Sequence, residues 1–163
     1  MKCSPQGTSN LRSGNEEAYR IVLPYLQRLG KKIFYFKEPG KATKLKLINN
    51  FVLGAFMVAI EEAVALGEKA GIEKSELIEI LENGAGNSIV LKAKKEKLLK
   101  EDFSTHFSVK NLLKDLTYAY DLAKSVRKPV FLNAQVKEIY TMAFSRGIED
   151  EDFSVIYQLL KAL

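Results

Sequence analysis

Residues 40–67 read GKATKLKLINNFVLGAFMVAIEEAVALG, and this stretch decides the fold. From Asn50 to Ile60 the stretch is apolar on nearly every side, which is typical of a helix surrounded by protein. Its start carries Lys46 and Asn50 four residues apart, so in a helix the two side chains lie one above the other. By periodicity alone such a pair faces solvent. If the helix lines a cleft, the pair can instead bind one small molecule.

Composition describes a helix-rich globular chain. The 163 residues are 47% hydrophobic and 28% charged and include only 4 prolines. The single cysteine, Cys3, cannot form an internal disulfide, and no signal-peptide pattern precedes the core, so a cytoplasmic location is expected. Glu61 and Glu62 interrupt the apolar run before it reaches the roughly 20 residues that cross a bilayer, so no membrane span is expected.

The net charge of +5 does not by itself indicate a nucleic-acid partner. Lysines are distributed over several predicted helices, and the run KAKKEKLLK at 92–100 alternates with leucines like a solvated helix face. No aromatic-rich strand or recognition-helix pattern accompanies the charge. We therefore expect no nucleic-acid binding, and a basic surface attracts a small anion equally well.

The N-terminal region has a different character from the rest. The first dozen residues are polar and predict an irregular start. NEEAYRIVLPYLQRLG, residues 15–30, predicts a helix despite Pro24, with Gly30 as its stop. KKIFYF, residues 31–36, predicts the single strand. One strand makes no sheet, so it pairs with the N-terminal residues or with another chain, or it is the edge of a sheet whose other strands are absent.

Helical periodicity continues from residue 40 to the C-terminus, without internal repeats. The predicted fold class is all-α: a multi-helix bundle around a long buried central helix (residues 40–163), preceded by a short helix-strand remnant of an α/β domain (residues 1–39). The predicted helices run from Gly40 to Gly67 or Gly71, from Ser75 to Gly84, from Ser88 to Lys100, from Phe107 to Arg127, from Pro129 to Gly147, and from Asp152 to Leu163.

Several common site patterns do not occur in the sequence. There is no GxGxxG after a strand, no Walker loop and no CxxC, and Gly84 with Gly86 reads as a plain turn between helices. His106 is the only histidine, which excludes a histidine-rich metal site, so we expect no metal. Because it follows a polar turn and precedes a helix, His106 is expected to be a capping or surface residue.

Several motifs occur in an order that resembles their order in one known family. GxxxxxKxxNN from Gly40 and EEA at 61–63 are followed by GIxxxxLIxxL from Gly71, FxxxxxxKDLxxA from Phe107 and a DFS helix start at 152–154. Together they resemble the C-terminal all-helical domain of the β-hydroxyacid dehydrogenases, the 3-hydroxyisobutyrate dehydrogenase family, which are relatives of 6-phosphogluconate dehydrogenase. The resemblance covers roughly residues 40 to 163, and residues 13 to 39 resemble the last helix and strand of that family's dinucleotide domain.

The resemblance implies a role for three residues. Lys46 matches the catalytic lysine, which takes the proton of the substrate hydroxyl as hydride leaves for the nicotinamide of NAD or NADP. Asn50 matches the asparagine that binds the substrate, a small 3-hydroxy acid, and Lys114 matches a lysine that contacts the cofactor. Gly54, one turn beyond Asn50, leaves room for a ligand or a neighbouring backbone. The family forms dimers or tetramers through this domain, so a homodimer is expected.

The sequence also departs from the family. The glycine-rich dinucleotide domain and the small-residue substrate loop that precede this region in the family do not occur in the 163 residues. We therefore expect a truncated or fragmentary family member, or a helical domain that depends on a separately encoded partner, in either case inactive by itself. Two other hypotheses are a complete oxidoreductase and a non-catalytic helical dimerisation or interaction domain.

Overall fold

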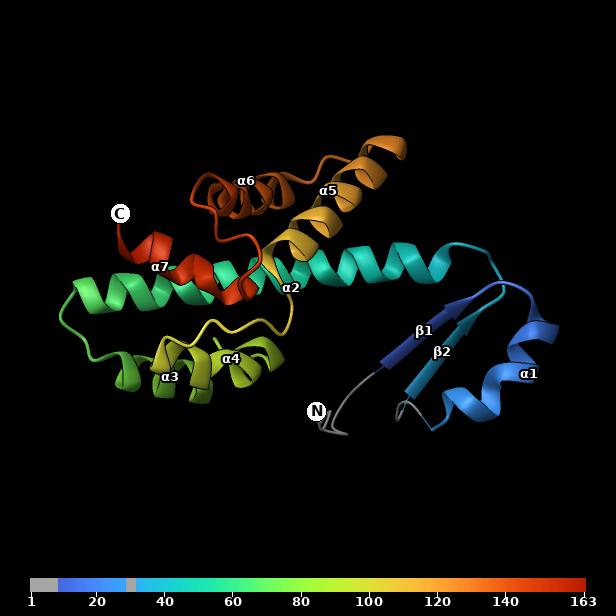
Figure 1. Cartoon of the computed structure of the whole chain (residues 1–163), viewed down its shortest axis with the longest axis horizontal. Helices are drawn as coiled ribbons and strands as arrows, with labels where there is room; N and C mark the ends of the chain where they lie inside the picture. Colours follow the sequence, from blue (N-terminus) through green and yellow to red (C-terminus); the bar gives the residue numbers. More distant parts are fainter. Residues whose placement is uncertain (1–8, 29–31) are drawn as a thin grey trace. The chain divides into compact units, whose positions relative to one another are not determined.

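The computed structural model describes residues 9–28 and 32–163, which are drawn in colour in Figure 1. By internal contacts the chain divides into two compact units, Met1–Asn49 and Asn50–Leu163. Helix α2 (Lys41–Lys69) begins in the first unit and continues as the central helix of the second. The fold is mostly helical, as predicted.

The first unit contains a strand, a helix and a second strand. These elements are β1 (Ser9–Ser13), α1 (Glu16–Leu26) and β2 (Lys32–Phe36), with β1 and β2 paired in parallel from Ser9 opposite Lys32 to Ser13 opposite Phe36. The Asn15 side chain caps α1 by accepting the backbone N–H of Ala18. The rings of Tyr19 and Tyr35 stack with centroids 4.0 Å apart, which attaches α1 to β2.

The predictions for this region have different outcomes. The strand near 31–36 is confirmed, and of its three possible partners the N-terminal residues are the one observed. The expectation of an irregular start is wrong for residues 9–12, because they belong to β1, whose sequence SNLRS has no alternating apolar pattern. Pro24 does lie inside α1, as predicted, whereas the proposed stop at Gly30 lies outside the described residues.

Helix α2 is 29 residues long and ends as predicted between Gly67 and Gly71. Gly71 has a φ of +84°, and its N–H and that of Ile72 donate to carbonyls of the last turn, a glycine-dependent helix end. Among the described residues it is the helix long and apolar enough to cross a bilayer. Its side chains Met57, Val58, Ile60 and Val64 are used in the core of the second unit, whereas Val52 and Phe56 are exposed, so the expected burial on nearly every side is only partly met.

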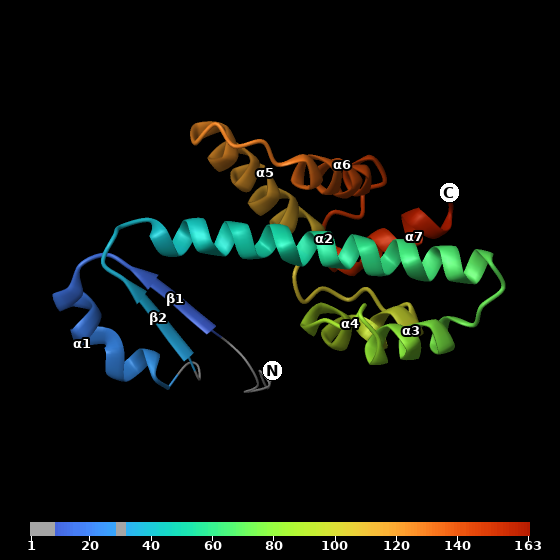
Figure 2. The same cartoon turned by 180° about the vertical axis from the view of Figure 1, so that it is seen from behind.

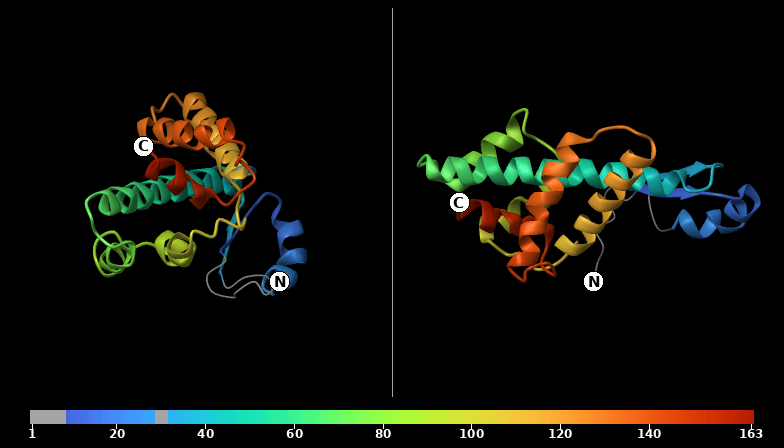
Figure 3. Two further views of the ribbon diagram at one scale, coloured as in Figure 1. Left: turned by 60° about the vertical axis from the view of Figure 1, so that its left-hand side comes forward. Right: turned by 90° about the horizontal axis from the view of Figure 1, so that it is seen from above.

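The second unit arranges shorter helices around α2. In Figures 1 and 2, α3 and α4 lie on one side of α2, and α5 and α6 lie on the other. Figure 3 shows the same arrangement from the side and from above, with α7 next to α2. The bounds are α3 (Lys74–Asn83), α4 (Ile89–Lys100), α5 (Val109–Ser125), α6 (Phe131–Ser145), the 3₁₀ turn η1 (Phe153–Val155) and α7 (Ile156–Lys161).

The observed helix starts agree with the predicted ones where the sequence contains a recognisable N-cap residue. Ser88 caps α4 by accepting the N–H of Leu91, as its position predicted. The helix expected from Asp152 to Leu163 is instead a 3₁₀ turn followed by a short helix. Asp152 caps the turn by accepting the N–H of Ser154. An aspartate N-cap is visible in sequence, but its use on a 3₁₀ turn is not.

The core of the second unit is formed where the helices meet α2. Gly54 lies at the closest approach, because a Cβ there would be 3.4 Å from Val136 and 3.5 Å from Leu112. Side chains from α5 and α6 therefore occupy the space that the sequence had left open to a ligand or a backbone. The largest fully buried apolar side chains are Met57 and Val64 of α2, Leu91 and Leu98 of α4, Val109, Leu112 and Leu116 of α5, Val136 and Tyr140 of α6, and Ile156 and Tyr157 of α7.

Candidate functional site

Lys46 and Asn50 lie on one continuous helix, four residues apart, as the sequence predicted. Lys46 is exposed, whereas Asn50 is only 9% exposed. Over one helical turn the environment therefore changes from that of an exposed residue to that of an amide buried in the second unit.

The amide of Asn50 is held by a carboxylate from another helix. Its Nδ2 donates to Oδ2 of Asp115 on α5 at 2.7 Å, and both groups are buried. A hydrogen bond to an ionised acceptor is stronger than a neutral one and sets the direction of the amide. Because an amide has a second N–H and a carbonyl oxygen, one bond to Asp115 leaves Asn50 with further groups that can bind a substrate.

No role for Asp115 was predicted from the sequence. It lies in the KDL motif directly after Lys114, and the structure buries it at 2% exposure. A signal was present, because Asp115 lies three residues after Leu112 and directly before Leu116, on the apolar face of α5. A carboxylate on a buried helix face requires a partner, and that partner is Asn50.

Lys114 precedes Asp115 on α5 and is exposed. Neighbouring residues of a helix point about 100° apart, so α5 turns the carboxylate inward and the amine outward. The structure thus separates the two residues of the motif by environment. The cofactor contact of Lys114 stays a prediction.

A pocket of about 440 Å³ lies next to Asn50. It is formed by α2, α4, the segment before α5 and η1, all within the second unit. Its polar lining residues are Asn50, Lys94 and His106, and the other lining side chains are apolar. Its volume is in the range of small-molecule sites, roughly 300–1,000 Å³.

Lys94 of this pocket forms a buried ion pair with Asp152. Its Nζ lies 2.7 and 2.8 Å from the two carboxylate oxygens of Asp152, which is completely buried. The same carboxylate accepts the backbone N–H groups of His106 and Phe107 at 3.0 and 3.2 Å and the hydroxyl of Ser154 at 2.7 Å. Burial raises the pKa of Asp152, but these donors outweigh it and hold the pKa below its usual value. Burial also lowers the pKa of Lys94, although its bond to Asp152 opposes that shift, so the pair depends on the donors around the Asp152 carboxylate.

His106 is exposed and attached to Asp152 through its backbone N–H, so the expectation of a surface residue is confirmed. It also lines the pocket next to Asn50, which the sequence did not indicate. In the described part of the chain, no group of three or more His, Cys, Asp or Glu residues could hold a metal ion.

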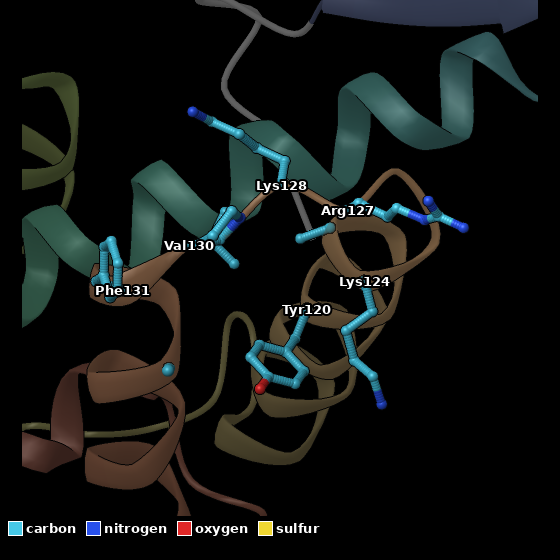
Figure 4. A pocket seen from close by; sticks show the side chains of 9 residues that line it. Tyr120, Lys124, Arg127, Lys128, Val130 and Phe131 are labelled. Atoms are coloured by element: carbon cyan, nitrogen blue, oxygen red, sulfur yellow. The ribbon is translucent and has the colours of Figure 1, made fainter.

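A second hollow of about 400 Å³ lies between the end of α5 and the start of α6. Figure 4 shows Tyr120, Val130 and Phe131 in its wall, with Lys124 and Arg127 extending away from it. Its lining contains no carboxylate, histidine or amide and none of the residues predicted to act in catalysis. The pocket next to Asn50 is the candidate functional site, because its lining includes a residue predicted to bind the substrate.

Solved structures share this fold. The chain superposes on a 3-hydroxyisobutyrate dehydrogenase from Salmonella typhimurium with a TM-score of 0.86 and 27% identity, covering 90% of this chain and 52% of that one. It also superposes on 3-hydroxyisobutyrate dehydrogenase from Mycobacterium tuberculosis, determined with L-serine, with a TM-score of 0.81 and 27% identity, covering 91% of this chain and 53% of that one. The class of fold is thus the one found in these dehydrogenases.

The family follows from sequence. Residues 40–160 match the family described as NAD-binding of NADP-dependent 3-hydroxyisobutyrate dehydrogenase, and the chain belongs to that family. Among curated relatives, glyoxylate/succinic semialdehyde reductase 2 of Arabidopsis thaliana is 34% identical over 152 residues, which are 93% of this chain and 42% of that protein. The human cytokine-like nuclear factor N-PAC is 33% identical over 148 residues, 91% of this chain and 27% of that protein. The chain spans about half, or less, of the length of these relatives.

Proposed function

We propose that the chain is the C-terminal helical domain of an NAD- or NADP-dependent dehydrogenase that oxidises a small 3-hydroxy acid. The observation that carries the proposal is the buried Asn50, which Asp115 holds at 2.7 Å next to a pocket, one helical turn after Lys46. The family to which the chain belongs, with its NAD-binding description, supports the choice of cofactor.

In the proposed reaction Lys46 takes the proton of the substrate hydroxyl. A bound nicotinamide would supply the hydride acceptor, so that loss of the hydroxyl proton and of a hydride from the carbon that bears this hydroxyl would leave a carbonyl. Asn50 donates to or accepts from the substrate and fixes its orientation, because its own amide is fixed by Asp115. In general a lysine is a base near neutrality only where its surroundings favour the neutral amine, as exclusion of water does.

The described residues do not form a complete dinucleotide site. The connection from β1 to α1 consists of Gly14 and Asn15, without the glycine-rich turn that lets a backbone approach a pyrophosphate. Lys114, exposed on α5, could contact only one part of a cofactor. We therefore infer that activity requires a dinucleotide-binding domain in addition to these residues, and that the described residues are inactive without one.

The test is oxidation of 3-hydroxyisobutanoate or 3-hydroxypropanoate by the full-length gene product. The reaction is monitored through the formation of the reduced nicotinamide cofactor. Lys46→Ala is expected to lower kcat by about 100-fold or more, since general bases contribute roughly 10²–10⁴ in rate. Lys44→Ala is the matched control, because Lys44 is a neighbouring exposed lysine whose ion pair is with Glu38. Equal activity of the two variants, or no binding of either cofactor, would contradict the proposal.

A second candidate function is a non-catalytic dimerisation or interaction domain. It is favoured by apolar side chains that remain exposed on the second unit, such as Val52 and Phe56 of α2 at 41% and 48% and Leu132 of α6 at 52%. A relative named as a nuclear factor rather than as an enzyme fits the same idea. Sedimentation showing a monomer at high concentration would exclude the homodimer.

A further inference from the structure

We propose that the hollow between the end of α5 and the start of α6 is a docking site for an acidic segment of a partner protein. One bulky apolar side chain of that segment enters the hollow, and carboxylates on either side of it meet the basic residues of the rim. The hollow shares no lining residue with the pocket next to Asn50. The inference therefore goes beyond the proposed dehydrogenase activity and does not depend on it.

The walls of the hollow carry the first part of the argument. They enclose about 400 Å³ and, apart from the basic residues, are formed by Tyr120, Ala123, Pro129, Val130, Phe131 and Ala134. Phe131 is 81% exposed, although it is a large apolar side chain next to a concave surface. Covering this ring and the apolar wall with an apolar side chain removes hydrophobic surface from water and stabilises a complex.

The charges of the hollow carry the second part. Lys124, Arg127 and Lys128 line it, and no carboxylate does. Within residues 9–28 and 32–163, none of the three forms an ion pair with a carboxylate. All three are exposed. An apolar hollow that is bordered by uncompensated positive charge is complementary to a partner with negative charge around an apolar group.

The backbone of Arg127 carries the third part. Its φ is +55°, in the left-handed region that glycine adopts most readily. Its N–H donates to the carbonyl of Lys124, and the N–H of Lys128 donates to that of Ala123, so this residue ends α5. Glycine would end the helix with less strain. An arginine that is kept in such a conformation indicates that its side chain is used.

The directions of the basic side chains favour an extended peptide over a small anion. Figure 4 shows Lys124, Arg127 and Lys128 extending away from the hollow in different directions. One small anion inside the hollow cannot contact all three, whereas a segment with several carboxylates can.

The lining also favours a peptide over a single-stranded nucleic acid. A nucleobase in the hollow would bury ring nitrogens and carbonyl oxygens, and the hydroxyl of Tyr120 is the uncharged polar side-chain group of the lining. The side chain of phenylalanine or leucine has no polar atoms that need partners.

A synthetic heptapeptide with three glutamates on each side of one phenylalanine tests the proposal. Fluorescence anisotropy of the labelled peptide with the full-length protein gives the dissociation constant. Replacing the phenylalanine by serine is expected to weaken binding about tenfold or more, because the apolar contact is lost. Replacing the glutamates by glutamines is expected to weaken binding about tenfold or more, because several exposed ion pairs are lost together.

Three variants locate the binding site. Lys124→Glu is expected to weaken binding about fivefold or more, whereas Lys92→Glu, the same change at an exposed position of α4, should not. Arg127→Gly should weaken binding about two- to fivefold without lowering the urea midpoint of unfolding, because glycine suits the left-handed backbone. Phe131→Ser should weaken binding about threefold or more, and Ile80→Ser, at a similarly exposed apolar residue of α3, is its control.

Each remaining outcome would overturn the proposal. Equal affinity for the phenylalanine and serine peptides would show that the surface attracts any polyanion and that the hollow takes no side chain. Tighter binding of labelled oligothymidylate than of the peptide would assign the hollow to nucleic acid. A shift of the protein itself from dimer to monomer in sedimentation with Lys124→Glu and Phe131→Ser would show that a second copy of the chain covers the hollow.

Discussion

Replacing Glu61 by glutamine is expected to stabilise the protein at neutral pH. Glu61 lies on α2 in the core, completely buried, and neither of its carboxylate oxygens has a hydrogen-bond partner among the described residues. Burial raises the pKa of Glu61 well above the ordinary 4.5, and the nearby charge of Asp152 adds to the effect. The backbone N–H of Tyr157, which does not reach hydrogen-bonding geometry, and the charge of Lys94 oppose it. The folded protein therefore keeps this carboxyl protonated where the unfolded chain has already released the proton.

The sign and size follow from proton linkage. Between 4.5 and the raised pKa the folded state binds one proton more than the unfolded state, so the free energy of unfolding falls as the pH rises. The loss is about 1.4 kcal/mol for each pH unit in that window, and it is absent below the unfolded pKa. Glu61→Gln keeps the shape of a neutral carboxyl without its titration, so the stability difference between variant and wild type should grow by about this amount per unit.

Urea unfolding of both proteins at a series of pH values between 4 and 7 measures this difference. Glu62→Gln is the matched control, because it removes a carboxylate at the next, exposed position of the same helix and should show no such slope. Since other titrating groups are common to all three proteins, their contributions cancel in the difference. A Glu61→Gln stability difference that does not change with pH would show that the buried carboxyl is charged in the folded state and would refute the reasoning.

Three further predictions concern buried contacts and the exposed surface. Asp115→Ala is expected to lower the free energy of unfolding in urea by about 1–3 kcal/mol, because the buried amide of Asn50 loses its acceptor. Lys114→Ala, at an exposed position, should change stability little. Equal effects of the two variants would contradict the buried contact. Asp152→Ala is expected to lower the free energy of unfolding by about 3–5 kcal/mol, because it leaves the buried ammonium of Lys94 unpaired and removes the cap of η1. Asp150→Ala, at an exposed position, is the control, and an equally small loss for both variants would be inconsistent with the ion pair. If the exposed apolar residues of α2 join two subunits, Phe56→Lys should shift sedimentation toward the monomer, and an unchanged sedimentation coefficient would place any self-association elsewhere.

Local sequence signals account for most of the helices. The end of α2 follows from Gly71, which takes up the positive φ of a helix end, and the start of α4 follows from the Ser88 cap. Strand β1 was not predicted, because its five residues are mostly polar and the ladder to β2 is made by backbone groups that any residue provides. A cytoplasmic location, the absence of a membrane span and the role of Lys114 stay predictions.

The sequence by itself determined the mostly helical class, the central helix and the positions of Lys46 and Asn50 on one of its faces, because helical periodicity and capping act over a few residues. Only the tertiary structure decided that Asp115, 65 residues away, holds the amide of Asn50, and that Asp152 neutralises Lys94 in the neighbouring pocket. Contacts between distant segments depend on how the helices pack, and no spacing within one helix records that packing. The candidate pocket is thus marked in the sequence by Asn50, one turn after Lys46 on α2, and the buried partners around it are set by the folded core.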